Sequence, residues 1–250
     1  MIPTGALPAS PEVSVGRGKH PCDVYLLTAF AGLVILGLVM VASASVTAAE
    51  KEGRDALYFL WRQTVSVGLG LGVAYAGLRT PTRVLRKLST FALFVAIALL
   101  AAVLVPGLGV ESHGAMRWLR VGPVSLQTSE LAKVLAILYL AGFIDRRAEA
   151  LRATNSGFLR PIAVSTILCV LLYVEPDYGA MVVLIATTLG MLFLGGVSMA
   201  RFLAVGSLAF AALAALVFIE PYRMVRITSF MNPLADPLEG GFQLSQALIA

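Results

Sequence analysis

Charged residues are scarce in this 250-residue chain, and their scarcity decides its class. Asp, Glu, Lys and Arg make up 13% of the residues, whereas 58% are hydrophobic. Soluble domains carry about 25% charged residues. A chain with so little charge cannot cover a globular surface with hydrated groups, so the composition excludes a soluble enzyme, a disordered chain and a fibrous repeat. It predicts an all-α polytopic membrane protein.

Cysteine and histidine are scarce too, with two residues of each. Cys22 and Cys169 are far apart and lie in or beside apolar segments, so they form neither a disulfide framework nor a metal-ligand spacing. The sequence contains no Walker loop, dinucleotide-binding glycine motif, His-Glu-x-x-His or nucleophile elbow. ATP-driven transport and metalloprotease chemistry lack their residues here. The net charge of +5 is scattered between apolar runs, which indicates a membrane protein and no nucleic-acid partner.

Long apolar runs are what the chain has in abundance. A helix needs about 20 apolar residues to cross about 30 Å of hydrocarbon. The runs predict about seven transmembrane helices, of which the fifth is the shortest and could instead be re-entrant; they are Val24–Val46, Leu60–Leu78, Leu88–Val105, Ser129–Ile144, Ile162–Val174, Tyr178–Val197 and Phe202–Ile219. The sequence therefore predicts a flexible tail over 1–23, a helix bundle over 24–219 and the start of a large extracellular loop over 220–250.

The distribution of basic residues predicts an orientation. Eleven Lys and Arg residues fall in 1–23, 79–87, 145–160 and 198–201, against six in the intervening connecting segments. Because cytoplasmic segments carry the excess of basic residues, the N-terminus is expected on the cytoplasmic side of the membrane. The first apolar run is too long and starts too late for a cleavable signal peptide, so we expect it to remain as an anchor.

A polar patch over Glu111–Lys133 departs from ordinary membrane sequence. Arg117 and Arg120 flank Trp118, a mixture that suits the outer headgroup level and serves equally for lipid anchoring or for substrate binding. Ser129 is predicted to cap a helix that carries Glu130 in its first turn. Lys133 lies three residues further on the same face and can pair with Glu130, in a structural or a functional role.

Two further patches carry polar residues. In Tyr-Val-Glu-Pro-Asp-Tyr-Gly over 173–179, Pro176 is expected to end a helix. Glu175 and Asp177 beside it could line a cavity, bind a divalent cation or form a solvated turn. The last patch, 220–250, is rich in turn residues and longer than a simple connector, as functional loops are. His113 is predicted to be an exposed loop residue.

The three patches, in this order and spacing, resemble the SEDS family (shape, elongation, division and sporulation) of bacterial cell-wall polymerases. The similarity runs from about residue 24 to 250, and its motifs are His113-Gly-Ala-Met-Arg-Trp118, Gly122-Pro123, Gln127-Thr-Ser-Glu-Leu-Ala-Lys133, Glu175-Pro-Asp-Tyr-Gly179, Tyr222-Arg223, Asp236-Pro237 and Gly241-Phe-Gln243. The chain departs from the family pattern at four positions, with His113 for Asn, Met116 for Arg, Thr128 for Pro and Ala180 for Thr. Met40–Ser45, Tyr58–Gln63 and Ser229–Pro233 are more similar to FtsW, the division member, than to RodA, the elongation member.

This resemblance implies a peptidoglycan glycosyltransferase of the division septum. Such proteins join lipid II, a disaccharide peptide on undecaprenyl pyrophosphate, into glycan strands beside a class B penicillin-binding protein and other division proteins. The reaction needs a carboxylate base and cationic groups around the departing pyrophosphate. The residues expected to line or support the substrate site are Arg117, Trp118, Gln127, Glu130, Lys133, Glu175 and Asp177. No cofactor is implied with certainty, and a divalent cation stays an alternative.

The resemblance also implies a ten-helix fold with its catalytic aspartate in a His-Thr-Asp-Phe segment. No His-Thr-Asp occurs in the 250 residues, so that aspartate is expected to lie beyond Ala250. We therefore expect the N-terminal part of such a protein, with about seven of its helices and no activity alone. Asp236, between Pro233 and Pro237, is expected to form a turn rather than to replace that base. A lipid II flippase or transporter and a non-enzymatic division scaffold remain alternative functions.

Overall fold

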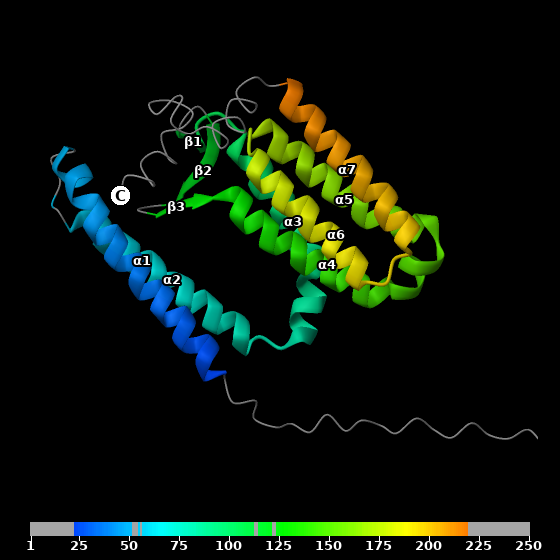
Figure 1. Ribbon diagram of the computed structural model, residues 1–250, viewed down its shortest axis with the longest axis horizontal. Helices are drawn as coiled ribbons and strands as arrows, with labels where there is room; N and C mark the ends of the chain where they lie inside the picture. Colours follow the sequence, from blue (N-terminus) through cyan, green and yellow to red (C-terminus); the bar gives the residue numbers. More distant parts are fainter. Residues whose placement is uncertain (1–22, 52–54, 56, 113–114, 122–123, 220–250) are drawn as a thin grey trace, which may run out of the picture. The chain divides into compact units, whose positions relative to one another are not determined.

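The computed structural model describes residues 23–51, 55, 57–112, 115–121 and 124–219 (Figure 1). The chain divides into two compact units, residues 1–77 and 78–250. The predictions for the N-terminal tail, Cys22, His113 and the segment from residue 220 to Ala250 concern residues outside this described part.

The described part of the first unit contains two helices, α1 (Val24–Lys51) and α2 (Tyr58–Arg79); the last two residues of α2 belong to the second unit. The start of α1 is fixed by Asp23, whose Oδ1 accepts hydrogen bonds from the backbone N–H groups of Tyr25 (3.0 Å) and Leu26 (3.3 Å). A short acceptor side chain in this position satisfies N–H groups that have no partner within the helix. The part Val24–Ser45 is apolar and long enough to cross a membrane.

The second unit is a helix bundle built around α4. Its described residues form five helices: α3 (Thr82–Val103), α4 (Thr128–Ala153), α5 (Asn155–Val174), α6 (Tyr178–Leu194) and α7 (Met199–Ile219). Figure 1 shows α4 along α3, α5 and α6, which it contacts, while α7 packs on α6. Buried leucines from four of these helices form the core: Leu100, Leu140, Leu168, Leu172 and Leu192.

Small and polar side chains bring these helices close together. An added Cβ at Gly142 of α4 would lie 2.6 Å from the Cβ of Ser89 on α3, so only glycine allows this approach. The Ser165 and Thr188 hydroxyls, both buried, lie 3.0 Å apart between α5 and α6. Such close contacts suit helices that associate in lipid, where packing replaces the hydrophobic effect.

The all-α polytopic membrane fold predicted from the sequence is confirmed. Each of the seven predicted apolar runs lies within or largely within one of the helices. Among the described residues, four helices are long and apolar enough to cross a membrane, in α1, α3, α5 and α7, and α6 is a shorter apolar helix. The fifth run proves longer than predicted, because α5 starts at Asn155 and carries Pro161 inside it.

The segment 145–160, which the sequence places between two apolar runs on the inner side, is helical at every residue except Thr154. The helix α4 continues to Ala153 through a kink at Arg147, where φ is −134° and ψ is 31°. The Thr154 side chain then caps α5 by accepting a hydrogen bond from the Gly157 N–H (3.1 Å). Hydropathy did not predict this continuation of α4, because its residues are rich in charge and form no apolar run.

A three-stranded antiparallel sheet at one end of the bundle was not predicted (Figure 1). Its strands β1 (Gly109–Ser112), β2 (Ala115–Val121) and β3 (Val124–Gln127) follow in chain order. The strand β3 leads directly into α4 at Thr128, so the predicted N-cap at Ser129 is wrong. Ser129 lies inside the first helical turn, which frees its hydroxyl for a tertiary contact.

Candidate functional site

Arg117 fastens the sheet to the connection between α5 and α6. From β2, its Nε donates a hydrogen bond to the Glu175 carbonyl oxygen (3.3 Å), and its Nη2 donates to the Pro176 carbonyl oxygen. A guanidinium presents several donors in a rigid fork, so it can hold two neighbouring carbonyls at once. Arg117 thereby anchors a strand to a turn 58 residues away in the chain.

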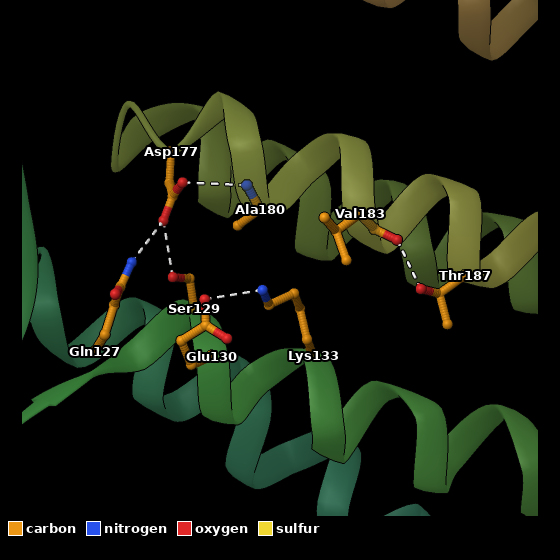
Figure 2. A network of polar contacts seen from close by, with 8 residues as sticks. All are labelled: Gln127, Ser129, Glu130, Lys133, Asp177, Ala180, Val183 and Thr187. Atoms are coloured by element: carbon orange, nitrogen blue, oxygen red, sulfur yellow. Dashed lines mark hydrogen bonds and ion pairs between the residues drawn. The ribbon is translucent and has the colours of Figure 1, made fainter. Parts of the chain in front are cut away.

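Asp177 joins three elements through one carboxylate. Its Oδ1 accepts a hydrogen bond from the Ala180 N–H (3.1 Å) and so caps α6. Its Oδ2 accepts from the Ser129 hydroxyl (2.8 Å) and from the Gln127 amide (3.3 Å), as Figure 2 shows. The side chain is buried, and the N-terminus of a helix favours its negative charge. The end of β3, the start of α4 and the start of α6 therefore meet at Asp177.

Glu175 lies at the same junction and is completely buried, with a relative exposure of 0%. The hydroxyl of Thr128, also buried, lies 3.2 Å from its Oε2. The pKa of Glu175 is raised to about 7: burial is the main cause and the charge of Asp177 adds to the rise, whereas a hydrogen bond accepted from Thr128 and the charge of Arg117 oppose it. Because no part of this side chain reaches the surface, the described structure favours a supporting role over contact with a ligand.

Glu130 and Lys133 form the ion pair that the sequence predicts, with Lys133 Nζ 2.9 Å from Glu130 Oε1. The side chain of Glu130 is 63% exposed, whereas that of Lys133 is 17% exposed. Figure 2 shows Lys133 extending from α4 toward α6, beside Ser129 and its contact with Asp177. A cation held in this half-buried position keeps more of its field than an exposed one, because less water screens it.

The structure brings most of the predicted site residues together. Hydrogen bonds join Arg117, Gln127 and Asp177 to the junction of β2, α4 and the α5–α6 turn, and the Glu130–Lys133 pair lies on the adjoining turns of α4. Trp118 is partly buried and pairs with Gln127 across β2 and β3. Among the described residues, no three His, Cys, Asp or Glu side chains are grouped as metal ligands.

Sequence reasoning missed the tertiary roles of Thr128 and Ser129. Both hydroxyls are buried, and each binds a carboxylate of the α5–α6 turn. The available signal was two hydroxyl residues directly before a charged residue at the start of a membrane helix. A membrane helix buries few hydroxyls without a partner, so such a pair indicates a polar contact.

Residues 24–250 match a family model described as a cell cycle protein, which covers FtsW, RodA and SpoVE. The chain belongs to the FtsW/RodA/SpoVE family. A relative from Nitrosococcus halophilus is 47% identical over 96% of this chain and 62% of its own length, and one from Halorhodospira halophila is 45% identical over 91% and 58%. Both are named probable peptidoglycan glycosyltransferase FtsW.

The chain spans about 60% of the length of these relatives. This agrees with the predicted N-terminal part of a longer family member. The location of the family's catalytic aspartate beyond Ala250 stays a prediction, since it concerns residues outside the 250 of this sequence.

Two solved structures share the fold of this FtsW/RodA/SpoVE family member. A mutant RodA of Thermus thermophilus is 32% identical, with a TM-score of 0.63 over 78% of this chain and 59% of its own. A peptidoglycan synthase complex that coordinates polymerization and crosslinking is 32% identical, with a TM-score of 0.62 over 86% of this chain and 64% of its own. The predicted family and the greater similarity to FtsW are confirmed, and the chain is a multi-pass membrane protein.

Proposed function

We propose that this chain forms the lipid-II-binding part of a peptidoglycan glycosyltransferase that acts in cell division. The observation that carries the proposal is the half-buried Lys133 ammonium beside the junction of the sheet, α4 and α6. A glycosyl transfer from a lipid pyrophosphate develops negative charge on the leaving group, and a cation fixed at that place stabilises it. The names of the relatives and the family motifs agree with this reaction.

Each candidate residue takes one role in this proposal. Lys133 binds the pyrophosphate, and Glu130 holds the ammonium in its orientation. Gln127 and Trp118 line the path of the headgroup on β3 and β2. Arg117 positions the sheet, because its guanidinium already donates to two backbone carbonyls.

None of the described acidic residues is assigned as the base that activates the sugar hydroxyl. Glu175 and Asp177 are buried, and Glu130 is paired with Lys133. These two buried residues support the site through their contacts with Thr128 and Ser129. The base would come from a part of the complete polymerase that follows Ala250, as the family resemblance implies.

The proposal includes an orientation and a partner. The sheet faces the outer leaflet of the cytoplasmic membrane at the septum, the N-terminus lies in the cytoplasm, and a class B penicillin-binding protein crosslinks the product. The basic residues in the predicted inner segments support this orientation. A structural neighbour that couples polymerization to crosslinking supports the partner. A membrane-impermeant maleimide should label a cysteine introduced at the exposed Met116 in intact cells.

The test is lipid II polymerisation in proteoliposomes. The protein is a chimaera in which residues 1–250 are followed by the remaining C-terminal part of the Nitrosococcus halophilus relative. Lys133→Met should reduce the rate at least about tenfold while membrane insertion is retained. The matched control is Arg160→Gln, which removes an exposed cation of α5 far from the sheet in the sequence and should leave the rate unchanged.

The alternatives are separate outcomes of the same experiment. Movement of fluorescent lipid II across the bilayer without polymer would replace the proposal with a flippase. Binding of the penicillin-binding protein with neither activity would replace it with a scaffold. Equal rates for the Lys133→Met and Arg160→Gln variants would remove Lys133 from the site.

A further inference from the structure

Thr128 carries one hydrogen but faces two acceptors. Its Oγ1 lies 3.2 Å from the Arg117 carbonyl oxygen and 3.2 Å from Glu175 Oε2, and the side chain is completely buried. A hydroxyl can donate one hydrogen bond and can accept others. If Glu175 were ionised, one of these two contacts would bring two oxygens together without a hydrogen between them. Both contacts can be full two-centre hydrogen bonds only when Glu175 carries a proton.

The surroundings of Glu175 favour that proton. Its Oε1 is buried and has no hydrogen-bond partner among the described residues. An unpartnered buried oxygen costs much less on a neutral carboxylic acid than on a carboxylate. Asp177, two residues away, contributes a negative charge from the same turn and disfavours a second one.

We propose that Glu175 is a neutral positioning residue whose proton completes a closed ring of hydrogen bonds between the sheet, α4 and the α5–α6 turn. Glu175 Oε2–H donates to Thr128 Oγ1, and the Thr128 hydroxyl donates to the Arg117 carbonyl oxygen. The ring closes where Arg117 Nε donates to the Glu175 carbonyl oxygen at 3.3 Å. Each residue gives one bond and receives one, and bonds arranged head to tail reinforce one another.

One residue of the ring, Thr128, departs from the sequence motif of the family. Thr128 stands where the resembling family has proline, which has no hydroxyl. The ring is thus a feature of this chain that the shared pattern does not supply.

Ionisation of Glu175 would open this ring. The charged groups that face Glu175 are Arg117 from β2 and Asp177 from its own turn, while α4 presents the Thr128 hydroxyl. Without the proton, Thr128 can donate fully to only one of its two acceptors, so the start of α4 weakens its bond either to the Arg117 carbonyl of β2 or to Glu175 in the turn. If the proposed glycosyltransferase function holds, the polymerisation rate falls as Glu175 ionises, because the junction between α4 and the sheet that carries Trp118 is held by one hydrogen bond fewer.

Infrared spectroscopy of the purified chain tests the proton directly and does not depend on the proposed function. The C=O stretch of a protonated carboxylic acid is distinct from carboxylate and amide bands. We expect this band to vanish as the pH rises through about 7 and to be absent from Glu175→Gln. The amide of that variant can donate to Thr128 as the acid does, so the ring survives and the pH dependence of polymerisation by the chimaera disappears.

Thr128→Val distinguishes the two directions of the Thr128–Glu175 bond. In the proposed ring, loss of the hydroxyl removes the acceptor of the acid proton, so the band should vanish about one pH unit lower. If Thr128 donates to the carboxylate instead, its bond lowers the pKa of Glu175, and the variant would keep the band to higher pH. The matched control is Thr187→Val, because the Thr187 hydroxyl bonds only to the Val183 carbonyl of its own helix in the described contacts (Figure 2).

Three results would overturn the inference. They are the absence of a protonated band in the wild-type chain, its persistence in Glu175→Gln, and a shift to higher pH in Thr128→Val. A chimaera without polymerase activity would overturn the proposed function and leave the infrared result valid.

Discussion

Replacement of Asp177 by alanine removes three hydrogen bonds at once from the junction between the sheet, α4 and α6. The change removes the acceptor for the Ala180 N–H at the start of α6, which costs about 1 kcal/mol for a helix cap. It also leaves the buried Ser129 hydroxyl without the acceptor at 2.8 Å, at a cost of about 1–3 kcal/mol. The Gln127 amide is half-buried and its bond is longer, at 3.3 Å, so it can turn to water. The free energy of unfolding should fall by about 2–4 kcal/mol.

Denaturant titration of the purified chain in detergent, followed by the fluorescence of Trp61 and Trp118, measures this loss. Asp177→Asn keeps an oxygen for the Ala180 N–H and should lose less than half as much. Ser129→Ala combined with Asp177→Ala should cost less than the sum of the single changes, because the hydroxyl that lost its acceptor is then gone. An Asp177→Ala loss within about 0.5 kcal/mol of zero would refute the reasoning, since surface substitutions cause changes of that size.

Three further predictions follow from other contacts. Gly142→Ala should destabilise the fold by about 1–3 kcal/mol, because the added Cβ would lie 2.6 Å from the Ser89 Cβ. The control is Gly190→Ala, whose added Cβ would meet no atom within 4 Å, and it should cause no loss of stability in the same denaturant titration. Arg117→Lys should lower the polymerisation rate of the chimaera about tenfold, because one ammonium cannot reproduce the fork that donates to two carbonyls, and an unchanged rate would contradict this. The stability that Glu175 contributes should be complete below about pH 4.5 and be lost as the pH rises through about 7, because burial raises its folded-state pKa. The free energy of unfolding should fall by at most about 3 kcal/mol over this range. If the Glu175→Gln variant showed the same dependence of unfolding free energy on pH, this prediction would be contradicted.

The helices of this protein are predictable because lipid imposes a simple rule on their sequences. A span must be apolar over its full length, and Val24–Ser45 and Met199–Ile219 satisfy the rule without help from neighbouring residues. The rule loses its force where a helix leaves the apolar layer. That is why the continuation of α4 to Ala153 and the early start of α5 at Asn155 could not be read from hydropathy.

The sheet and the junction show a different limit. The strands β1 and β3 have four residues each, too few for a periodic pattern to stand out from a polar loop. The charges of the Glu130–Lys133 pair were found because both partners lie on one helix. The contact of Ser129 with Asp177 joins residues 48 positions apart, and it depends on the packing of α4 against α6, which local sequence does not encode.

Because β3 passes directly into α4, the number of residues between Gln127 and Lys133 is fixed. Gln127 and Ser129 reach the same carboxylate oxygen from the two sides of the strand-to-helix transition, and Lys133 follows one helical turn later. A helix advances by about 100° per residue, so one residue inserted after Thr128 would rotate Ser129 and Lys133 away from α6 or shift Gln127 out of register with Trp118. A deletion or insertion of one residue here would therefore break the contacts of Gln127 and Ser129 with Asp177 together.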